Sequence, residues 1–289
     1  MKKNKAVNPA PDLFMDTARR FLRNRAAVLG AVILLVILFF IIFANVLIPK
    51  EMVTSYDITA RLSGPCPGHP FGTDNMGRDV FARVVYGARV SVGIGVGSTL
   101  VGLLLAAVLA AMCALSTKLD YILMRIMDVW SSIPAVLLAL VFLAVLGGSV
   151  ANMMLTLSVV SIPSFTIQIR SVVLSVAERD YVKAARLSGS RGVGLALRHI
   201  LPNAIDVIIV DATMTVSAMM LSAAGLSAIG MGVAPPSPEW GAMLSYATDY
   251  IKNAPHLFIF PGLAVVVTAI AINLVGDGLR DALDPGSLK

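Results

Sequence analysis

Six long apolar runs alternate with polar intervals, and this alternation limits the possible folds more than any other feature. The runs cover residues 26–48, 90–115, 122–146, 150–169, 204–233 and 256–275. An α-helix rises about 1.5 Å per residue, so about 20 apolar residues cross the hydrocarbon core of a bilayer, which is roughly 30 Å thick. We therefore predict an all-α polytopic membrane protein with about six transmembrane helices.

The composition supports a membrane protein and argues against other classes. Of 289 residues, 57% are hydrophobic and 14% are charged, against about 45–50% and about 25% in soluble domains. The net charge of +6 comes from basic residues near the apolar runs, so it indicates topology and not a nucleic-acid partner. Cys66 and Cys113 are far apart and lack metal-ligand spacing, so we expect neither a disulfide nor a metal site.

The N-terminal segment, residues 1–25, is strongly basic and precedes the first apolar run. That run is longer than the core of a signal peptide, about 7–15 residues, so we interpret it as a retained anchor with a cytoplasmic N-terminus. Residues 14–25 are expected to form an amphipathic helix at the membrane surface. Counting crossings from this anchor places the loop at Lys118, the interval 178–203 and the C-terminal tail 280–289 in the cytoplasm, which agrees with the positive-inside bias.

The predicted organisation follows from these crossings. A cytoplasmic segment (1–25) leads into the first transmembrane helix (26–48), which is followed by an extracytoplasmic loop (49–89). The remainder, 90–289, is a five-helix core with one large cytoplasmic loop, 178–203, and an extracytoplasmic loop, 234–255.

The interval 178–203, which we term the basic loop, is too charged for hydrocarbon but has the pattern of an ordered structure. Its cations are Arg179, Lys183, Arg186, Arg191 and Arg198. Alanine and leucine at 184–187 favour a helix, Gly189 is a stop signal, and Pro202 marks the start of the next helix. We predict two short helices joined at the glycine, although an ordinary basic loop would share this composition.

The spacing of Ala184-Ala185, Gly189 and Ile200-Leu201-Pro202 resembles the "EAA" loop of permease subunits in ABC importers. In that family the helix inserts into a groove of a cytoplasmic ATPase subunit and transmits its movement to the membrane helices. The family usually has glutamate where this chain has Lys183. The resemblance assigns the ATPase-coupling role to Tyr181, Lys183, Ala184, Ala185, Arg186, Gly189, His199, Leu201 and Pro202.

The loop before the second apolar run contains glycines that permit tight turns and charged side chains that can pair or cap a helix. A self-satisfied polar cluster is favoured over direct contact with substrate. The pattern HPFGTDxxGRDVxxRxxYGxRxS resembles the signature of permeases from the dipeptide, oligopeptide and nickel branch of ABC importers. The matching residues are Phe71, Gly72, Thr73, Asp74, Gly77, Arg78, Asp79, Arg83, Tyr86, Gly87 and Arg89.

The loop 234–255 begins with Pro235, Pro236 and Pro238 and carries Trp240, which suits the boundary between membrane and water, as do Tyr246 and Tyr250. Its PPxPxWGxML pattern resembles the same family, as does the ending NLxGDGLRDALDP at residues 273–285. We expect a short interfacial helix that helps to receive a solute-binding protein.

Over almost the whole chain, the resemblance is to the second permease subunit of peptide or nickel systems. It implies the type I importer fold, a heterodimer with a second permease subunit, two cytoplasmic ATPase subunits and an extracytoplasmic solute-binding protein in the cell inner membrane. The sequence has no GxxxxGK[ST] motif, so we expect ATP and Mg²⁺ to bind the ATPase subunits and this chain to bind no cofactor. The cargo stays open among peptides, nickel, other metal complexes and heme.

Several polar or helix-breaking residues interrupt the apolar runs. Asp128 and Asp211 are candidates for a translocation pathway, because acids inside a membrane usually face a bundle interior, although both could lie near the interface. Pro134 and Pro163 could permit bending. The glycines at 93, 95, 97 and 102 predict a face for close helix packing.

Two other functions are compatible with parts of the sequence. A secondary transporter would need no docking loop and would usually show inverted repeats, which are not evident here. An intramembrane serine protease would use Ser227 and His256 as nucleophile and base, although small residues around Ser227 are more simply explained by helix packing. His69, His199 and His256 lie in separate loops and indicate no metal-ligand set.

Overall fold

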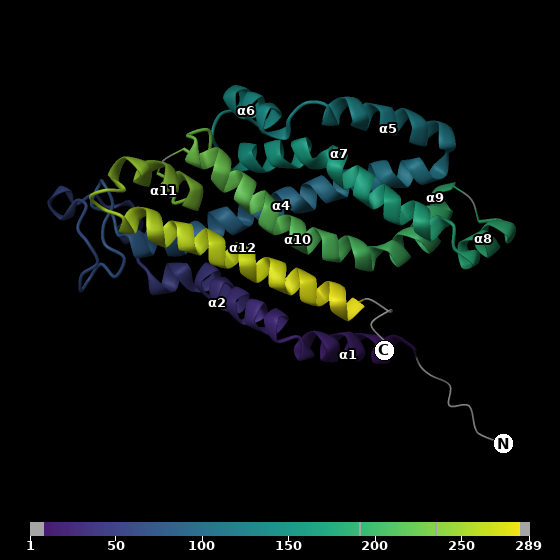
Figure 1. The fold of residues 1–289 in the computed structure, drawn as a ribbon, viewed down its shortest axis with the longest axis horizontal. Helices are drawn as coiled ribbons and strands as arrows, with labels where there is room; N and C mark the ends of the chain where they lie inside the picture. Colours follow the sequence, from purple (N-terminus) through teal and green to yellow (C-terminus); the bar gives the residue numbers. More distant parts are fainter. Residues whose placement is uncertain (1–8, 191, 235, 284–289) are drawn as a thin grey trace, which may run out of the picture.

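The computed structural model describes residues 9–190, 192–234 and 236–283, and this part of the chain is almost entirely helical (Figure 1). The longer helices are α1 (Pro9–Arg23), α2 (Arg25–Leu47), α4 (Val80–Leu115), α5 (Thr117–Ser131), α6 (Ala135–Leu146), α7 (Val150–Ala177), α10 (Leu201–Ala228) and α12 (His256–Leu283). The shorter elements are α3 (Glu51–Thr54), η1 (Ile58–Ala60), α8 (Asp180–Leu187), α9 (Gly192–Leu195), the π-helical turn η2 (Ala196–Ile200), α11 (Trp240–Ala247) and η3 (Thr248–Tyr250).

Five helices of the described chain are long and apolar enough to cross a membrane, namely α2, α4, α7, α10 and α12. Helices α5 and α6 qualify together as a sixth span, but they are bent by 81° where they meet. This agrees with the all-α fold of about six spans. The third apolar run, 122–146, is divided at this bend, where bending at Pro134 was expected: Pro134 has no N–H group and disfavours helical geometry in the residue before it, so α5 ends and α6 starts in a new direction.

Helix α4 starts ten residues earlier than the predicted second span, at Val80. The Asp79 side chain caps it by accepting a hydrogen bond from the Ala82 N–H at 2.6 Å. The signature residues Arg83, Tyr86 and Arg89 were expected in an extracytoplasmic loop, and they lie instead in the first turns of this helix. Their polarity suggested a loop, but their side chains reach the backbone of other segments.

The core is built around α4, which packs against α7 and α10, while α2 lies along α12 (Figure 1). Small residues make the close contacts possible. A Cβ atom at Gly95 would lie 3.0 Å from the Val216 carbonyl oxygen on α10, and one at Gly102 would collide with Phe165 on α7, at 2.7 Å. Gly95, Gly97 and Gly102 therefore pack closely against neighbouring helices, as predicted, whereas Gly93 is exposed and a Cβ there would meet no heavy atom within 4 Å.

The basic loop lies at one end of the helix bundle, and the segments 49–79 and 234–255 lie at the opposite end (Figure 1). Helices α8 and α9 are at one end, and α11 with the segment 49–79 is at the other. Helix α1 and the last turns of α12 lie toward the α8 end. This separation is the one that the predicted crossings require.

Candidate functional site

The basic loop folds into a compact protrusion, beginning with α8 and a tight helix end. Gly189 has φ +95°, and it ends α8 with the paired hydrogen bonds of a Schellman motif. The Gly189 N–H donates to the Arg186 carbonyl at 3.1 Å, and the Ser190 N–H donates to the Ala185 carbonyl at 3.0 Å. The chain then re-enters the bundle through α9, η2 and α10, with Pro202 in the first turn of α10.

One side of α8 is anchored and the other is free. Val182 is fully buried, in a cluster with Val176 and Leu195. The opposite side presents Lys183 and Leu187, of which Leu187 is 91% exposed. The Leu187 side chain therefore contributes nothing to packing within the chain.

The other predicted coupling residues are distributed along the same protrusion. Tyr181, Ala184 and Arg186 are exposed on α8, whereas Ala185 is half-buried against the apolar cluster beneath it. His199 is half-buried in η2, and Leu201 and Pro202 begin α10. Arg191 lies outside the described residues. The exposed pair of Lys183 and Asp180, 3.7 Å apart, is the ion pair that the structure describes on α8.

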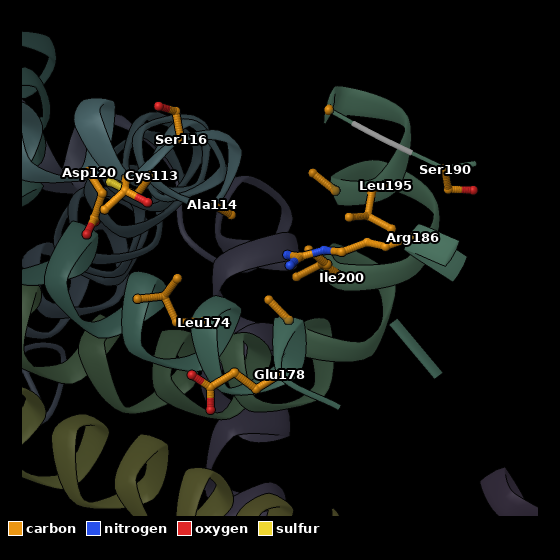
Figure 2. Close-up of a pocket in the computed structure, with 14 residues that line it drawn as sticks. Cys113, Ala114, Ser116, Asp120, Leu174, Glu178, Arg186, Ser190, Leu195 and Ile200 are labelled. Carbon is orange, nitrogen blue, oxygen red and sulfur yellow. The ribbon is translucent and has the colours of Figure 1, made fainter. Parts of the chain in front are cut away.

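A cavity of about 460 Å³, which we term the loop cavity, lies behind the basic loop (Figure 2). Its walls are the turn between α4 and α5, the C-terminal end of α7, and the loop itself. Figure 2 shows the Arg186 side chain extending from α8 into this space. No ion pair or hydrogen bond to the Arg186 guanidinium appears within the described ranges.

An ion pair that the sequence did not reveal closes one wall of the loop cavity. The guanidinium of Arg170, on α7, donates two hydrogen bonds to the Asp120 carboxylate on α5, one of them 2.6 Å long. The two residues are 50 positions apart, so no local pattern predicts the pairing. A forked contact of this kind fixes the start of α5 against α7.

At the other end of the bundle, the signature residues form a hydrogen-bonded group that we term the signature network. At its centre, Asp74 accepts from the Arg78 Nε at 2.7 Å and lies 3.6 Å from the Arg83 Nε. The other Asp74 oxygen accepts the backbone N–H groups of Met76 and Arg78. Asp79 also contacts His69, with 2.8 Å between Oδ2 and Nδ1.

Arg83 extends the signature network to two further segments. Its side chain is 3% exposed, and its Nη1 donates to the Val53 carbonyl at 3.2 Å and to the Pro236 carbonyl at 3.4 Å. One guanidinium therefore joins α4 to the chain before it and to the loop that leads into α11. Because these charges are buried and paired, they hold the fold together and present little surface to a ligand.

Tyr86 and Arg89 connect α4 to α2. The Tyr86 hydroxyl donates to the Ile48 carbonyl at 2.9 Å, and the Arg89 guanidinium donates to the Asn45 side chain at 3.1 Å and the Ile42 carbonyl at 3.3 Å. The Ile48 carbonyl lies at the C-terminal end of α2, where a helix leaves its last carbonyls without intrahelical partners. Both side chains therefore link helices, which explains why polar residues are tolerated inside α4.

Tight packing of the backbone also holds the signature network. Gly77 has φ +76°, and a Cβ atom there would lie 1.8 Å from the Asp57 carbonyl oxygen. The Asp57 carboxylate accepts from the Thr59 hydroxyl and N–H, and these bonds hold its pKa below the usual value. Phe71 stacks on Phe260 of α12, with ring centroids 3.9 Å apart. Thr73, Gly72 and Gly87 are buried in the same region.

Glu239 is a structural residue that the sequence reading missed. It is fully buried, and its carboxylate accepts from two backbone N–H groups in the first turn of α11, at 2.8 and 2.7 Å, and from the Ser91 hydroxyl at 3.2 Å. Trp240 follows it and was expected at the membrane boundary; it is buried, and its Nε1 donates to the Val84 carbonyl at 2.8 Å. An acid directly before a short helix was the available signal.

The two pathway candidates lie on different helices. Asp128 is exposed on α5 and lies 3.7 Å from Arg125, one turn away. Asp211 is half-buried on α10, and no side chain in the described ranges pairs with its carboxylate. The structure does not bring the two carboxylates into one site.

The nucleophile and base of a serine protease are not assembled. The His256 Nε2 lies 3.3 Å from the Thr73 carbonyl oxygen, and the Ser227 hydroxyl is buried with no hydrogen-bond partner within the described ranges. A Cβ atom at Gly232 would meet the Ser227 oxygen at 1.9 Å, so the hydroxyl is covered by backbone. A nucleophile needs a base within hydrogen-bond reach and an open face, and Ser227 has neither.

Comparison with known proteins agrees with this architecture. Residues 99–289 match the family described as binding-protein-dependent transport system inner membrane component, and residues 13–65 match the N-terminal TM domain of oligopeptide transport permease C. The glutathione transport system permease protein GsiD of Pectobacterium atrosepticum is 38% identical over 268 residues, which cover 92% of this chain and 89% of that protein. GsiD of Escherichia coli O6:K15:H31 is 38% identical over 278 residues, covering 92% and 88%. The chain therefore belongs to the family of binding-protein-dependent inner-membrane transport components, as a permease subunit of an ABC importer of the peptide and nickel type.

Proposed function

We propose that this permease subunit is driven through α8 of the basic loop, which docks on a cytoplasmic ATPase subunit. The observation that carries the proposal is the contrast between the two sides of α8. Val182 fixes the helix to the bundle, while Leu187 is 91% exposed beside Lys183 and Arg186. An apolar residue surrounded by cations suits a groove that is apolar at its centre and acidic at its rim.

The proposed assembly contains four kinds of subunit. This chain pairs with a second permease subunit in a heterodimer, two ATPase subunits bind ATP and Mg²⁺ below it, and a solute-binding protein delivers cargo from outside. The chain performs no bond chemistry in this scheme. Both termini are in the cytoplasm, and the assembly lies in the inner membrane; the position of α1 and of the end of α12 near the α8 end supports that orientation (Figure 1).

Transport follows from a rigid connection between loop and helices. The Schellman motif at Gly189 and the packed base of α8 make the protrusion move as one body with α7 and α10. Closure of the ATPase subunits then shifts the helices between two packed arrangements, one open to each side. The chain acts as a gate whose equilibrium its partners bias.

Short peptides of about the size of glutathione are the proposed cargo. The support is the similarity to GsiD permeases, whose name gives glutathione as the substrate of their system. Nickel and other metal complexes are the competing cargo class for this family. Uptake of labelled glutathione, a tripeptide and a nickel chelate by cells that carry or lack the complete system would separate the classes; uptake of the chelate alone would contradict the proposal.

The ATPase contact is tested by reversing charge on α8. Lys183→Glu and Arg186→Glu are expected to lower the amount of ATPase that copurifies, and to lower transport, by about tenfold or more, since a mismatched charge at an interface costs several kcal/mol. Gly189→Phe should uncouple ATP hydrolysis from transport through the strain of its positive φ. Lys252→Glu, at the opposite end, is the matched control and should leave copurification unchanged. Unchanged copurification and transport in all α8 variants would exclude this docking surface.

A secondary transporter would give a different result. In proteoliposomes, the complex should transport only with ATP and its ATPase subunits present. Transport by the purified permease pair on an ion gradient, without ATP, would overturn the proposed mechanism.

A further inference from the structure

The loop cavity presents two unpaired charges of opposite sign. Arg186 extends into it from α8, and Glu178 lines it at the end of α7 (Figure 2). They form no ion pair with each other or with another described residue. The third charged residue of the wall, Asp120, is already bound by Arg170. A volume of about 460 Å³ is large enough for a ligand group that carries both charges.

A second cavity, which we term the apolar groove, adjoins the loop cavity and has a volume of about 310 Å³. One wall is a single face of α4, formed by Leu104, Ala107, Val108, Ala111 and Met112, and the other wall consists of apolar residues from α9 to α10. Over eight residues the helix rises about 12 Å, close to half of the roughly 30 Å hydrocarbon core. The groove has the length of one leaflet.

The two cavities lie next to each other on the same elements. Ala196 lines both of them, and α4 contributes Met112 to the groove and Cys113 to the loop cavity. Charged side chains line only the loop cavity, whereas the lining of the groove is apolar. A ligand that reached from one cavity into the other would need a charged end and a hydrocarbon end.

We propose that this surface binds a phospholipid with a primary-ammonium headgroup, of the phosphatidylethanolamine type. Arg186 donates to the phosphate, since a guanidinium matches two phosphate oxygens. Glu178 accepts hydrogen bonds from the ammonium, and one acyl chain fills the apolar groove. Phosphatidylcholine lacks ammonium N–H donors and phosphatidylglycerol lacks the cation, so both leave Glu178 without a hydrogen-bonded partner. Arg186 belongs to the proposed ATPase contact as well, so the Arg186 variant tests the lipid site only where the ATPase subunits still copurify; Glu178 and the apolar groove are independent of that contact.

Lipid binding to the assembled importer, extracted with its partner subunits and titrated with lipid, tests the proposal by native mass spectrometry. The three probes are phosphatidylethanolamine, phosphatidylcholine and phosphatidylglycerol with identical acyl chains. We expect phosphatidylethanolamine to bind about tenfold more tightly than either of the others, as for one charge-assisted hydrogen bond. Equal affinity for the ethanolamine and choline lipids would overturn the assignment without any variant being needed.

Single substitutions then locate the site. Glu178→Gln should abolish the preference for phosphatidylethanolamine over phosphatidylcholine, whereas Arg186→Gln should weaken all three lipids. Both residues are exposed, so both variants should fold. Arg198→Gln is the control on the same loop, exposed and outside the cavity, and should leave lipid affinity unchanged. An equal loss in Arg198→Gln would show non-specific attraction and overturn the site.

The apolar groove has its own pair of variants. Ala111→Phe fills the groove, while Leu109→Phe places the same ring on α4 at a residue outside it; both positions are half-buried. Only Ala111→Phe should lower lipid retention, and Ala111→Leu serves the same purpose if the phenylalanine variant does not assemble.

Full competition by soluble phosphoethanolamine would identify a soluble ligand instead of a lipid. Absence of retained lipid would mean that a partner subunit covers the groove; either result overturns the proposal.

Discussion

The signature network and the basic loop contain similar numbers of charged residues, yet they use them in opposite ways. In the signature network, the Asp74 carboxylate and the Arg78 and Arg83 guanidinium groups are buried, and each has hydrogen-bond partners. In the basic loop, Lys183 and Arg186 are exposed, and the Arg186 guanidinium extends into a cavity. Buried charges must be paired within the chain, whereas exposed ones remain available to partners. The signature network is therefore structural, whereas the charges of the basic loop are not used to hold the chain together.

The strongest test of this contrast removes one carboxylate from each region. Asp74→Ala leaves two buried guanidinium groups without a counter-ion, and it should lower the free energy of unfolding by about 3–5 kcal/mol. The measurement is thermal unfolding of the purified protein in detergent. Asp180→Ala, whose carboxylate is fully solvent-exposed on α8, should leave the melting temperature unchanged. Equal effects would remove the distinction between the two regions.

Glycine substitutions give the next largest difference. Gly77→Ala combines a positive φ with a collision against the Asp57 carbonyl, so it should cost about 2–5 kcal/mol of stability. Gly189 also has a positive φ, but no heavy atom lies within 4 Å of an added Cβ. Gly189→Ala should therefore cost only about 1–2 kcal/mol. A larger loss for Gly189→Ala would show that the basic loop is packed as tightly as the signature network.

A pair of tyrosine variants isolates a single hydrogen bond. Tyr86→Phe removes the bond to the Ile48 carbonyl and should lower the unfolding free energy by about 1 kcal/mol. Tyr181→Phe, on the exposed side of α8, removes a hydroxyl with no partner in the described ranges and should have no effect on unfolding. Its effect on ATPase copurification is the sharper measurement, because a loss there without a loss of stability would place Tyr181 in the interface.

The smallest expected change is the loss of the ion pair on α8. Lys183→Ala breaks a pair of exposed side chains 3.7 Å apart, and surface pairs of this kind contribute little. We expect the unfolding free energy to change by less than about 0.5 kcal/mol. A destabilisation above about 1 kcal/mol, on the order of one buried hydrogen bond, would mean that Lys183 has a structural role.

Local sequence patterns predict those parts of the fold that depend on residues close together in the sequence. The apolar runs gave the spans, and the alanines and Gly189 gave α8 of the basic loop. These features depend on hydropathy and backbone preference over a few residues. The prediction of a short helix in the loop 234–255 succeeded for the same reason, since α11 follows a cluster of prolines. The second short helix of the basic loop, expected at 193–199, instead runs without a break into α10.

Features that depend on distant partners could not be predicted in this way. Arg83 and Arg89 made the start of α4 look like a loop, because their acceptors are carbonyls on other segments. The pairing of Asp120 with Arg170 joins residues 50 positions apart, and Glu239 finds Ser91 at a separation of 148. Trp240 was expected at the membrane boundary from its residue type alone. Its burial depends on contacts with α4, which its neighbours in sequence do not reveal.

The corner between α5 and α6 has a consequence for how the subunit is surrounded. With 12 residues, α6 rises only about 18 Å and cannot cross the hydrocarbon layer alone. The corner residues 132–134 are exposed on this chain, and irregular backbone at such depth is tolerated only against protein or beside water. We therefore expect the corner, if it lies within the hydrocarbon layer, to be shielded from acyl tails by another polypeptide or by the aqueous passage.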